Sequence, residues 1–346
     1  MTTLPDLLRT RTELERGREL GWYTGAQLFV SLRGEVLADI AIGESRPGVP
    51  MTPSTLVEWG SATKPVTCGA ALLLWQRGLF DLDDPVCRFI PEFARAGKDG
   101  VTIRHLLTHT GGLRDVVDDL APFDEAVAAI CEAPLLDDWV PGVRHGYNSA
   151  AMWIVAALVS RLSGSPFDQF VRVEIFEPLG LMDSWIGMPP ETFHSYGNRI
   201  AVIPGFPPSG TERWVTWGRP TGGGHGPIGE LARFYQSLLE HRLLSAPVVE
   251  AMTARQLCGS YDETLRAVVD RGFGVMQASS YAGHSYGPHA SNRCFGHGGK
   301  NWCVAFGDPV YGLAAGVYWN GRVDGDTHAE RQTSLLGAIY EDLSLV

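Results

Sequence analysis

The sequence lacks the features that mark disulfide scaffolds, nucleic-acid-binding proteins and membrane proteins. Its six cysteines are scattered along 346 residues without a Cys-x-x-Cys pair, which is typical of free thiols in a reducing compartment. The net charge is −11 and no basic run is present, so we expect neither nucleic acid nor an anionic membrane surface as a partner. No apolar window approaches the length of a membrane span, and the polar N-terminus has no apolar signal core. We therefore expect a cytoplasmic protein.

Internal repeats and low-complexity segments are also missing from the sequence. Hydrophobic residues make up 45% of the chain and charged residues 19%, a composition that is typical of a globular protein and not of a disordered one. A chain of this length can bury a sizeable core, either in one large domain or in two lobes.

Strand-like patterns lie near both ends of the chain, and helical patterns dominate between them. An amphipathic helix at about 4–20 precedes two apolar runs at 26–32 and 36–42, which a turn at 33–35 joins as a hairpin. Apolar residues at helical spacing predict further helices at 122–131, 150–162, 166–175, 227–243 and 328–343. Short apolar runs split by turns predict strands at 272–277, 294–297, 302–307 and 312–319.

This order predicts an α/β (α+β) sandwich. Its mixed, largely antiparallel sheet would be built from both termini and flanked by helices, with an all-helical lobe inserted. We place the sheet domain at residues 1–78 and 266–346, and the mostly helical lobe at 79–265. Within the lobe, segment 187–224 is rich in Gly, Pro and Trp and has no clear periodicity. We expect it to be a structured excursion that lines a pocket, since unstructured loops of this length are unusual.

A serine and a lysine lie three residues apart at the start of an apolar, helix-like run. Gly60 precedes Ser61, and Lys64 follows one turn later. Residues three apart share a helical face, so the Lys64 ammonium can reach the Ser61 hydroxyl. Free N–H groups and the dipole at a helix N-terminus would stabilise an oxyanion there. The same pair also fits an ordinary helix start, because serine commonly caps helices.

Two further motifs lie downstream of this pair. Tyr147 lies in a glycine-bounded turn before an apolar helix and is followed by Asn148 and Ser149. His297 lies in the run Phe-Gly-His-Gly-Gly-Lys, which leads into a strand. Taken singly, Tyr147 fits a half-buried structural tyrosine, and His297 fits a structural histidine in a tight turn.

Taken together, the three motifs resemble the serine β-lactamase-like family, in particular its branch of class C β-lactamases, carboxylesterases, D-aminopeptidases and transacylases. That family carries Ser-x-x-Lys, then Tyr-x-Asn, then Lys-Thr-Gly or His-x-Gly, and supporting stretches match it at 105–113, 176–182 and 228–234. The resemblance covers the chain from about residue 20 to the final helix. It implies a β-lactamase/transpeptidase-like fold with the active site between a sheet domain and a helical lobe. Ser61, Lys64 and Tyr147 would be the catalytic residues.

Departures from the family pattern bear on substrate binding. Ser149 stands where the family usually has asparagine, so either the substrate contacts differ or Asn148 partly replaces them. His297 takes the place of the Lys-Thr-Gly lysine and removes a cation that would hold a β-lactam carboxylate, which weakens the case for β-lactam substrates. Trp302 stands where small residues are usual and would reshape the acyl pocket. The expected substrate-binding residues are Asn148, Ser149, His297, Gly298, Gly299 and Trp302.

The expected mechanism passes through an acyl ester on Ser61. A serine hydroxyl is a poor nucleophile without a base. Lys64 and Tyr147 would share a proton, take one from Ser61 and return it to the leaving group, and the sequence does not decide which is the formal base. The oxyanion hole would consist of the backbone N–H of Ser61 and, by resemblance, that of Lys300.

The expected substrate is a small-molecule ester or amide, and no cofactor or metal is expected. The acyl group would pass to water in an esterase or amidase, or to an amine or alcohol in a biosynthetic transacylase. A pocket lined by Trp302, Trp214 or Trp217 would exclude water and favour a larger acceptor. The alternative is a catalytically silent binding or assembly module.

A metal enzyme is a third hypothesis, because histidines and a cysteine cluster near the last strands. Their spacing matches no standard zinc pattern, and the surrounding glycines explain the cluster as a turn. The residues concerned are His284, His289, Cys294 and His297. The sequence leaves open the acyl donor, the acceptor and the oligomeric state.

Overall fold

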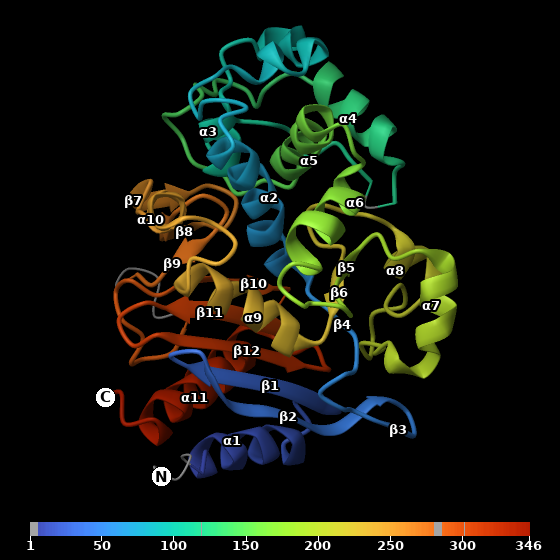
Figure 1. Cartoon of the computed structure of the whole chain (residues 1–346), viewed down its shortest axis with the longest axis vertical. Coiled ribbons are helices and arrows are strands. Elements are labelled where there is room, and N and C mark those ends of the chain that lie inside the picture. The colour runs from blue at the N-terminus through green and yellow to red at the C-terminus, as the bar shows by residue number, and fades with distance from the viewer. Residues whose placement is uncertain (1–5, 119, 280–285, 301) are drawn as a thin grey trace.

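The computed structural model describes residues 6–118, 120–279, 286–300 and 302–346. A large antiparallel sheet forms the lower half of the molecule in Figure 1, and most helices gather above it. In these residues the sheet has nine strands in the order β3-β2-β1-β12-β11-β10-β9-β8-β7. The strands in chain order are β1 (Gly25–Leu32), β2 (Glu35–Arg46), β3 (Val49–Pro50), β7 (Leu257–Asp262), β8 (Ala267–Arg271), β9 (Met276–Gln277), β10 (Phe295–Gly299), β11 (Cys303–Asp308) and β12 (Leu313–Trp319).

A small second sheet and the helices complete the described structure. The small sheet has the order β4-β6-β5, with β4 (Val57–Glu58), β5 (Trp185–Ile186) and β6 (Gly224–Gly226). The helices are α1 (Leu8–Glu19), α2 (Lys64–Gln76), α3 (Ile103–Leu107), α4 (Phe123–Glu132), α5 (Ala150–Ser163), α6 (Phe167–Val171), α7 (Pro190–Tyr196), α8 (Glu212–Thr216), α9 (Ile228–Leu239), α10 (Ala246–Thr253) and α11 (Gly325–Asp342).

Strands from both ends of the chain meet in the large sheet, as the sequence predicts. β1 pairs with β12, so that Ala26 lies opposite Trp319 and Leu32 opposite Leu313. The predicted hairpin is β1–β2, and β12 continues the sheet through β11 to β10. The sheet was expected to be mixed, but the pairs between its described strands are antiparallel. Neighbours such as β1–β2 and β11–β12 follow each other closely in the chain, and short connections of this kind join antiparallel strands.

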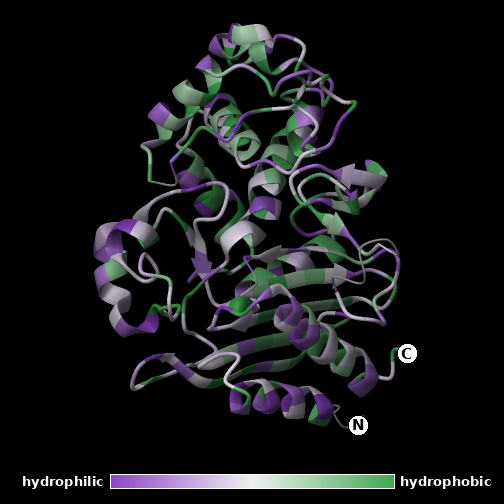
Figure 2. Ribbon diagram, turned by 180° about the vertical axis from the view of Figure 1, so that it is seen from behind, coloured by the Kyte–Doolittle hydropathy of each residue, from purple (hydrophilic) through white to green (hydrophobic). Residues whose placement is uncertain are grey.

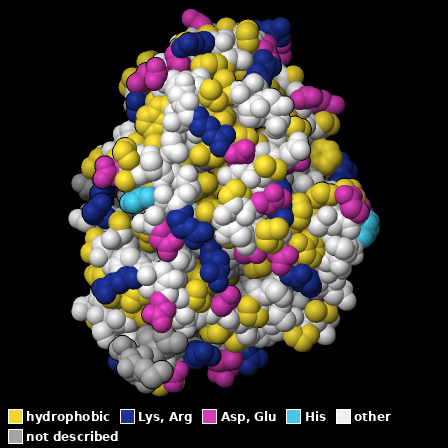
Figure 3. All heavy atoms as spheres, in the orientation of Figure 1, with side chains coloured by type: hydrophobic (Ala, Val, Ile, Leu, Met, Phe, Trp, Pro, Cys, Tyr) yellow, Lys and Arg dark blue, Asp and Glu magenta, His cyan; other side chains and the backbone are white. Residues whose placement is uncertain are grey.

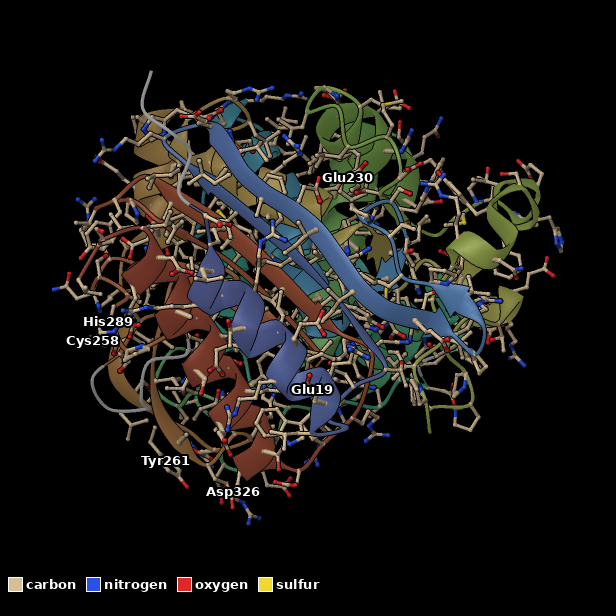
Figure 4. All side chains as sticks on the ribbon, turned by 90° about the horizontal axis from the view of Figure 1, so that it is seen from below. Glu19, Glu230, Cys258, Tyr261, His289 and Asp326 are labelled. Atoms are coloured by element: carbon tan, nitrogen blue, oxygen red, sulfur yellow. The ribbon has the colours of Figure 1, made fainter. Side chains whose placement is uncertain are left out.

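Helices cover both faces of the sheet. Successive residues of β12 point to opposite sides, so Val317 and Trp319 join the apolar core that includes α1 and α11, whereas Tyr318 joins the other core. Helix α9 packs on β1, β11 and β12 from that second side. Figure 4, seen from below, shows α1 and α11 lying together against the sheet. The central strands are therefore apolar on both faces.

Helix α2 connects the helical half of the molecule to the sheet. It packs against α5 and α6, and α3 and α4 pack against α5 in turn. The same apolar core includes residues of α2, α5, β10 and β11. Figure 2 shows the inner helices of the upper half as mainly hydrophobic, in contrast to the more hydrophilic α1 at the bottom. The start of α2 therefore lies where the helical half meets the sheet.

Several predicted elements are confirmed with small shifts. The helices expected at about 4–20, 122–131, 150–162 and 227–243 are α1, α4, α5 and α9, although residues 1–5 lie outside the described residues. The helix expected at 166–175 is α6 followed by a π-helical turn, Arg172–Phe176. Such π-helical turns are rare and mostly occur as single turns within α-helices.

Two elements depart from the predicted helical lobe at 79–265. Helix α9 lies on the sheet, and β7 is an edge strand of the sheet. Helix α2 belongs to the predicted sheet domain and packs against helices of the lobe. An amphipathic pattern identifies the buried side of a helix but not its packing partner, so the sequence does not predict where α9 and α2 pack. The remainder of the division at 1–78, 79–265 and 266–346 stays a prediction.

Segment 187–224 forms a structured excursion with α7, α8 and a 3₁₀ turn, Gly197–Arg199.

In the described residues no single helix is long and apolar enough to cross a membrane, and only the bent pair Ala150–Ser163 with Phe167–Phe176 passes on length and composition. On the face drawn in Figure 3, basic and acidic side chains are interspersed.

Candidate active site

Ser61 lies in a 3₁₀ turn, Gly60–Thr63, that leads directly into α2. The sequence placed it at the start of an α-helix, and the 3₁₀ turn is a small correction. In a 3₁₀ turn, residues three apart are aligned along the axis. The Lys64 Nζ consequently lies 3.3 Å from the Ser61 Oγ and donates to it. The predicted serine and lysine therefore meet in the structure.

Segment 187–224 also contacts Lys64 and helps to fix its side chain. Its side chain is 1% exposed, and its Nζ also donates to the carbonyl of Thr221 at 2.9 Å. The neighbouring Thr67 hydroxyl donates to the carbonyl of Pro220. These bonds fix the amine beside the nucleophile, which is the geometry that a proton acceptor for Ser61 requires. The excursion thus supports the lysine.

Tyr147 lies between the side chains of Lys64 and Arg271. The Lys64 Nζ is 4.8 Å from the centroid of its ring, and the Arg271 Cζ is 5.0 Å from it. The backbone N–H of Tyr147 donates to Asp262 Oδ1 at 3.0 Å, which fixes the turn. Its hydroxyl is buried and has no hydrogen-bond partner among the described residues. Positive charges this close stabilise negative charge that develops on a reacting group.

The two predicted oxyanion donors are brought together by a contact between glycines. A Cβ on Gly299 would meet the Trp59 carbonyl oxygen at 2.0 Å, so only glycine fits there. Gly60 lies against Gly299 and has a φ of +52°. The backbone of Ser61 therefore runs beside that of Lys300, which also adopts a positive φ of 41°. Non-glycine residues in this conformation cluster at functional sites.

His297 on β10 faces the same cavity as a neutral ring. Its Nδ1 lies 2.7 Å from the carbonyl oxygen of Gly298, so Nδ1 carries the proton and donates. Burial, together with the charges of Lys64 and Arg271, lowers the pKa of His297 to about 3. Its Nε2 is then an acceptor, and it is buried without a partner among the described atoms. The ring supplies no positive charge at neutral pH.

The depressed pKa of His297 makes the stability of the fold depend on pH. Between the ordinary value of 6.5 and about 3, the unfolded chain binds a proton that the folded chain excludes, so the free energy of unfolding falls as pH falls. His297→Gln removes this contribution. We expect the urea midpoint of the variant to fall less than that of the wild type between about pH 7 and about pH 5. The same change at exposed His241 is the control, and equal slopes for wild type and His297→Gln would contradict the assignment.

A cavity of about 380 Å³ opens beside Ser61. The residues that line it come from the 3₁₀ turn before α2, the Tyr147 turn, the sheet with its connections, and α11. They are Ser61, Tyr147, Leu265, Arg271, Met276, Tyr286, His297, Gly298, Gly299, Lys300, Cys303, Val304, His328 and Gln332. No described residue of segment 187–224 belongs to this set, so the expectation that the excursion lines the pocket is not met here.

Asn148 does not face the cavity, contrary to its predicted role in substrate binding. Its Nδ2 donates to the carbonyl of Leu113, and its Oδ1 accepts from the N–H of Ala151 at 2.8 Å. The amide is thus used to hold the start of α5. Ser149 is half-buried and its N–H donates to Asp115 at 2.9 Å. Neither side chain lines the cavity, because the residue after Tyr147 turns into the helical half.

Trp302 is also placed differently from its prediction. It is fully buried and packs against Phe206, with ring centroids 5.5 Å apart. Trp214 is buried beneath Arg219, and the Trp217 indole donates to the carbonyl of Ala121. None of these tryptophans lines the cavity beside Ser61.

The described residues of the hypothetical metal cluster do not converge. Within the described ranges, no group of three or more His, Cys, Asp or Glu side chains could hold a metal ion. His289 lies near the edge of the view in Figure 4, with its Nε2 3.6 Å from Glu341. Cys294 is buried in the core behind the sheet. His284 lies outside the described residues.

Three residues that contact Lys64 or Tyr147 were not predicted from the sequence. Thr221 supplies the carbonyl for Lys64, Asp262 holds the Tyr147 turn, and Arg271 lies over the Tyr147 ring. Arg271 precedes a glycine at the end of an apolar strand. A charged residue at the end of a strand is only a weak sign of a functional role. The residues that Arg271 contacts in the site, such as Tyr147, are distant in the sequence.

The chain is similar to a family model and to known proteins. The description of the matching family is "Beta-lactamase", and the match covers residues 11–338. The chain is 37% identical over 194 residues to esterase EstB of Burkholderia gladioli, covering 49% of each chain. It is 31% identical over 163 residues to the beta-lactamase of Escherichia coli K12, covering 45% of this chain and 43% of that protein.

The alignments thus span about half the length of these curated relatives or less. A solved penicillin-binding protein homologue from Caulobacter crescentus is similar over 99% of both chains, with a TM-score of 0.86 and 27% identity. The family match over most of the sequence and the likeness of the whole fold lead to one conclusion. The chain belongs to the beta-lactamase family.

Proposed function

We propose that the protein is a serine esterase or amidase that cleaves small molecules through an acyl ester on Ser61. The observation that carries this proposal is the bond from the buried Lys64 Nζ to the Ser61 Oγ at 3.3 Å, at the edge of a cavity. A nucleophile and a proton acceptor within reach of each other are what acyl transfer requires. The esterase named among the relatives supports an ester as the first substrate class to test.

In the proposed reaction, Ser61 Oγ attacks the substrate carbonyl and its proton passes to the Lys64–Tyr147 pair. The oxygen of the tetrahedral intermediate accepts from the backbone N–H groups of Ser61 and Lys300. The carbonyl then re-forms, the bond to the leaving group breaks, and the proton returns to the leaving group. Water, activated by the same pair, releases the acid and restores Ser61.

An alcohol or an amine is a second acceptor for the acyl group. His297 lines the cavity, and its unpartnered Nε2 is a hydrogen-bond acceptor for the hydroxyl or N–H of an incoming nucleophile. The neutral His297 ring would not hold the carboxylate of a β-lactam at this position. We therefore rank esters and amides ahead of β-lactams.

Acyl transfer is tested by the competition between acceptors. With a p-nitrophenyl ester, added methanol or a primary amine should yield the methyl ester or the amide in addition to the acid, and p-nitrophenol release should quicken where deacylation limits turnover. The products are separated by chromatography, with Ser61→Ala as the control. Only acid at every acceptor concentration would make the protein a hydrolase alone. No turnover and no labelling by a fluorophosphonate would favour the silent binding module.

A further inference from the structure

Arg271 is a buried arginine in the wall of the cavity beside Ser61. It is the last residue of β8, where its backbone lies opposite Leu257 on β7 and Met276 on β9. The side chain is 1% exposed and lines the cavity together with Ser61 and Tyr147. A guanidinium is always charged in proteins, so a full positive charge is held inside this wall.

The guanidinium of Arg271 is only partly satisfied. Its Nη2 donates to Asp262 Oδ2 at 3.2 Å. Its Nε and Nη1 are buried and have no hydrogen-bond partner among the described residues. Buried donors of a charged group are costly to leave unpaired. A group that enters the cavity and accepts from these nitrogens would recover that cost.

Asp262 is not free to satisfy the remaining donors. Its Oδ1 already accepts from the backbone N–H groups of Tyr147, Thr264 and Leu265, each at 3.0 Å. Its Oδ2 lies 3.2 Å from both Arg271 Nη2 and His145 Nε2. Burial alone would raise the pKa of this carboxyl, but these N–H groups and the nearby charges hold it below its usual value. The carboxylate is thus ionised and fully engaged at neutral pH.

The cavity wall carries an excess of positive charge. Arg271 and Lys300 are the Lys and Arg residues among the described residues that line the cavity, and this set contains no Asp or Glu. Asp262, which pairs with Arg271, does not belong to the lining. The histidines add no charge at neutral pH, because burial and then the charge of Arg271 lower the pKa of His145 to about 4, and the pKa of His297 is about 3. This group of side chains is therefore complementary to an anion.

We propose that Arg271 binds a carboxylate of the substrate through its unpaired N–H groups, so that the preferred substrates are esters or amides that carry a free carboxylate. This inference rests on the proposed function at Ser61. A carboxylate supplies acceptor oxygens of the opposite charge, and charge-assisted hydrogen bonds of this kind are the strong ones. The positive charge that binds the carboxylate is that of Arg271 on β8, and not a charge on His297 of β10.

Two matched pairs of esters test the proposal on either side of the scissile bond. Mono-p-nitrophenyl adipate and its methyl ester differ in charge on the acyl side. Para-carboxyphenyl acetate and its methyl ester differ on the leaving-group side. For wild type, kcat/KM should favour the carboxylate in at least one pair by about 10- to 100-fold. Arg271→Gln should abolish that ratio, and Arg271→Lys should retain part of it.

Arg144→Gln is the matched control, because Arg144 pairs with Glu263 outside the cavity, at 2.6 Å. It should keep the wild-type ratio. No preference in either pair, or a preference that survives in folded Arg271→Gln, would overturn the proposal.

Binding to Ser61→Ala separates this inference from the proposed function. Monomethyl adipate should bind that variant at least about tenfold more tightly than dimethyl adipate by calorimetry, and the added change Arg271→Gln should remove the difference. The difference would persist even if Ser61 were not a nucleophile. Equal binding of the two compounds would overturn the role of Arg271, whatever the activity.

Discussion

Replacing Ser61 by alanine is expected to lower kcat for p-nitrophenyl esters by at least about 10⁴-fold, because the reaction loses its covalent step. The side chain is half-buried, and its hydroxyl accepts one bond, from Lys64 at 3.3 Å. The free energy of unfolding should therefore change by no more than about 1 kcal/mol. Steady-state kinetics and urea unfolding of the same preparations provide both numbers.

Ser54→Ala is the matched control for this variant, because Ser54 is an exposed serine in the segment that precedes the same turn. It should retain the activity of the wild type. Ester hydrolysis by Ser61→Ala within tenfold of the wild-type rate would contradict the assignment of the nucleophile.

Replacing Lys64 by methionine is expected to lower kcat by about 10²- to 10⁴-fold, since the proton of Ser61 loses its acceptor. Methionine keeps the length and apolar stem of the side chain but removes the Nζ that joins Ser61 to the Thr221 carbonyl. The KM should change less than kcat, because the lysine does not line the cavity wall.

Lys98 offers a matched control for burial. It is also 1% exposed, and its Nζ donates to the carbonyls of Cys131 and Ala133, away from the cavity. Lys98→Met should lose stability as Lys64→Met does, because each removes a buried amine and leaves carbonyls unpaired. Only Lys64→Met should lose activity. Equal losses of kcat in the two variants would show that Lys64 acts through stability alone.

The parts of the site that follow from local chain geometry could be predicted from the sequence. Ser61 and Lys64 lie one turn apart, so any helical turn brings them together. Tyr147 and His297 could be placed near them only through the order of the motifs and the family resemblance. The structure brings Ser61, Tyr147 and His297 to one cavity because the 3₁₀ turn before α2, the Tyr147 turn and β10 meet there.

The wrong predictions concern residues whose role depends on the direction of the side chain and not on the spacing of residues in the sequence. Asn148 is adjacent to Tyr147, yet its amide points away to the Leu113 carbonyl and holds α5. Trp302 lies two residues after Lys300, the second predicted oxyanion donor, yet it is buried and packs against Phe206. Arg271 and Asp262 belong to neighbouring strands, and no short motif marks either one. Such roles depend on tertiary packing that periodicity does not encode.

The fold could likewise be predicted only where it depends on local sequence. Hairpins and helices are local, so β1–β2, α4 and α5 agree with their predictions. The sequence does not show which apolar faces meet. The strand order of the sheet and the packing of α9 on it depend on those contacts. An apolar stripe shows which side of a helix is buried, but it does not identify the element against which that side packs.

Intact-protein mass spectrometry during turnover of a p-nitrophenyl ester tests the central claim most directly. Rapid acid quenching should reveal protein heavier by one acyl group, and peptide mapping should place that group on Ser61. The adduct should decay as substrate is exhausted and should be absent from Ser61→Ala. Turnover without any adduct on Ser61, or an acyl group carried on another residue, would contradict the account.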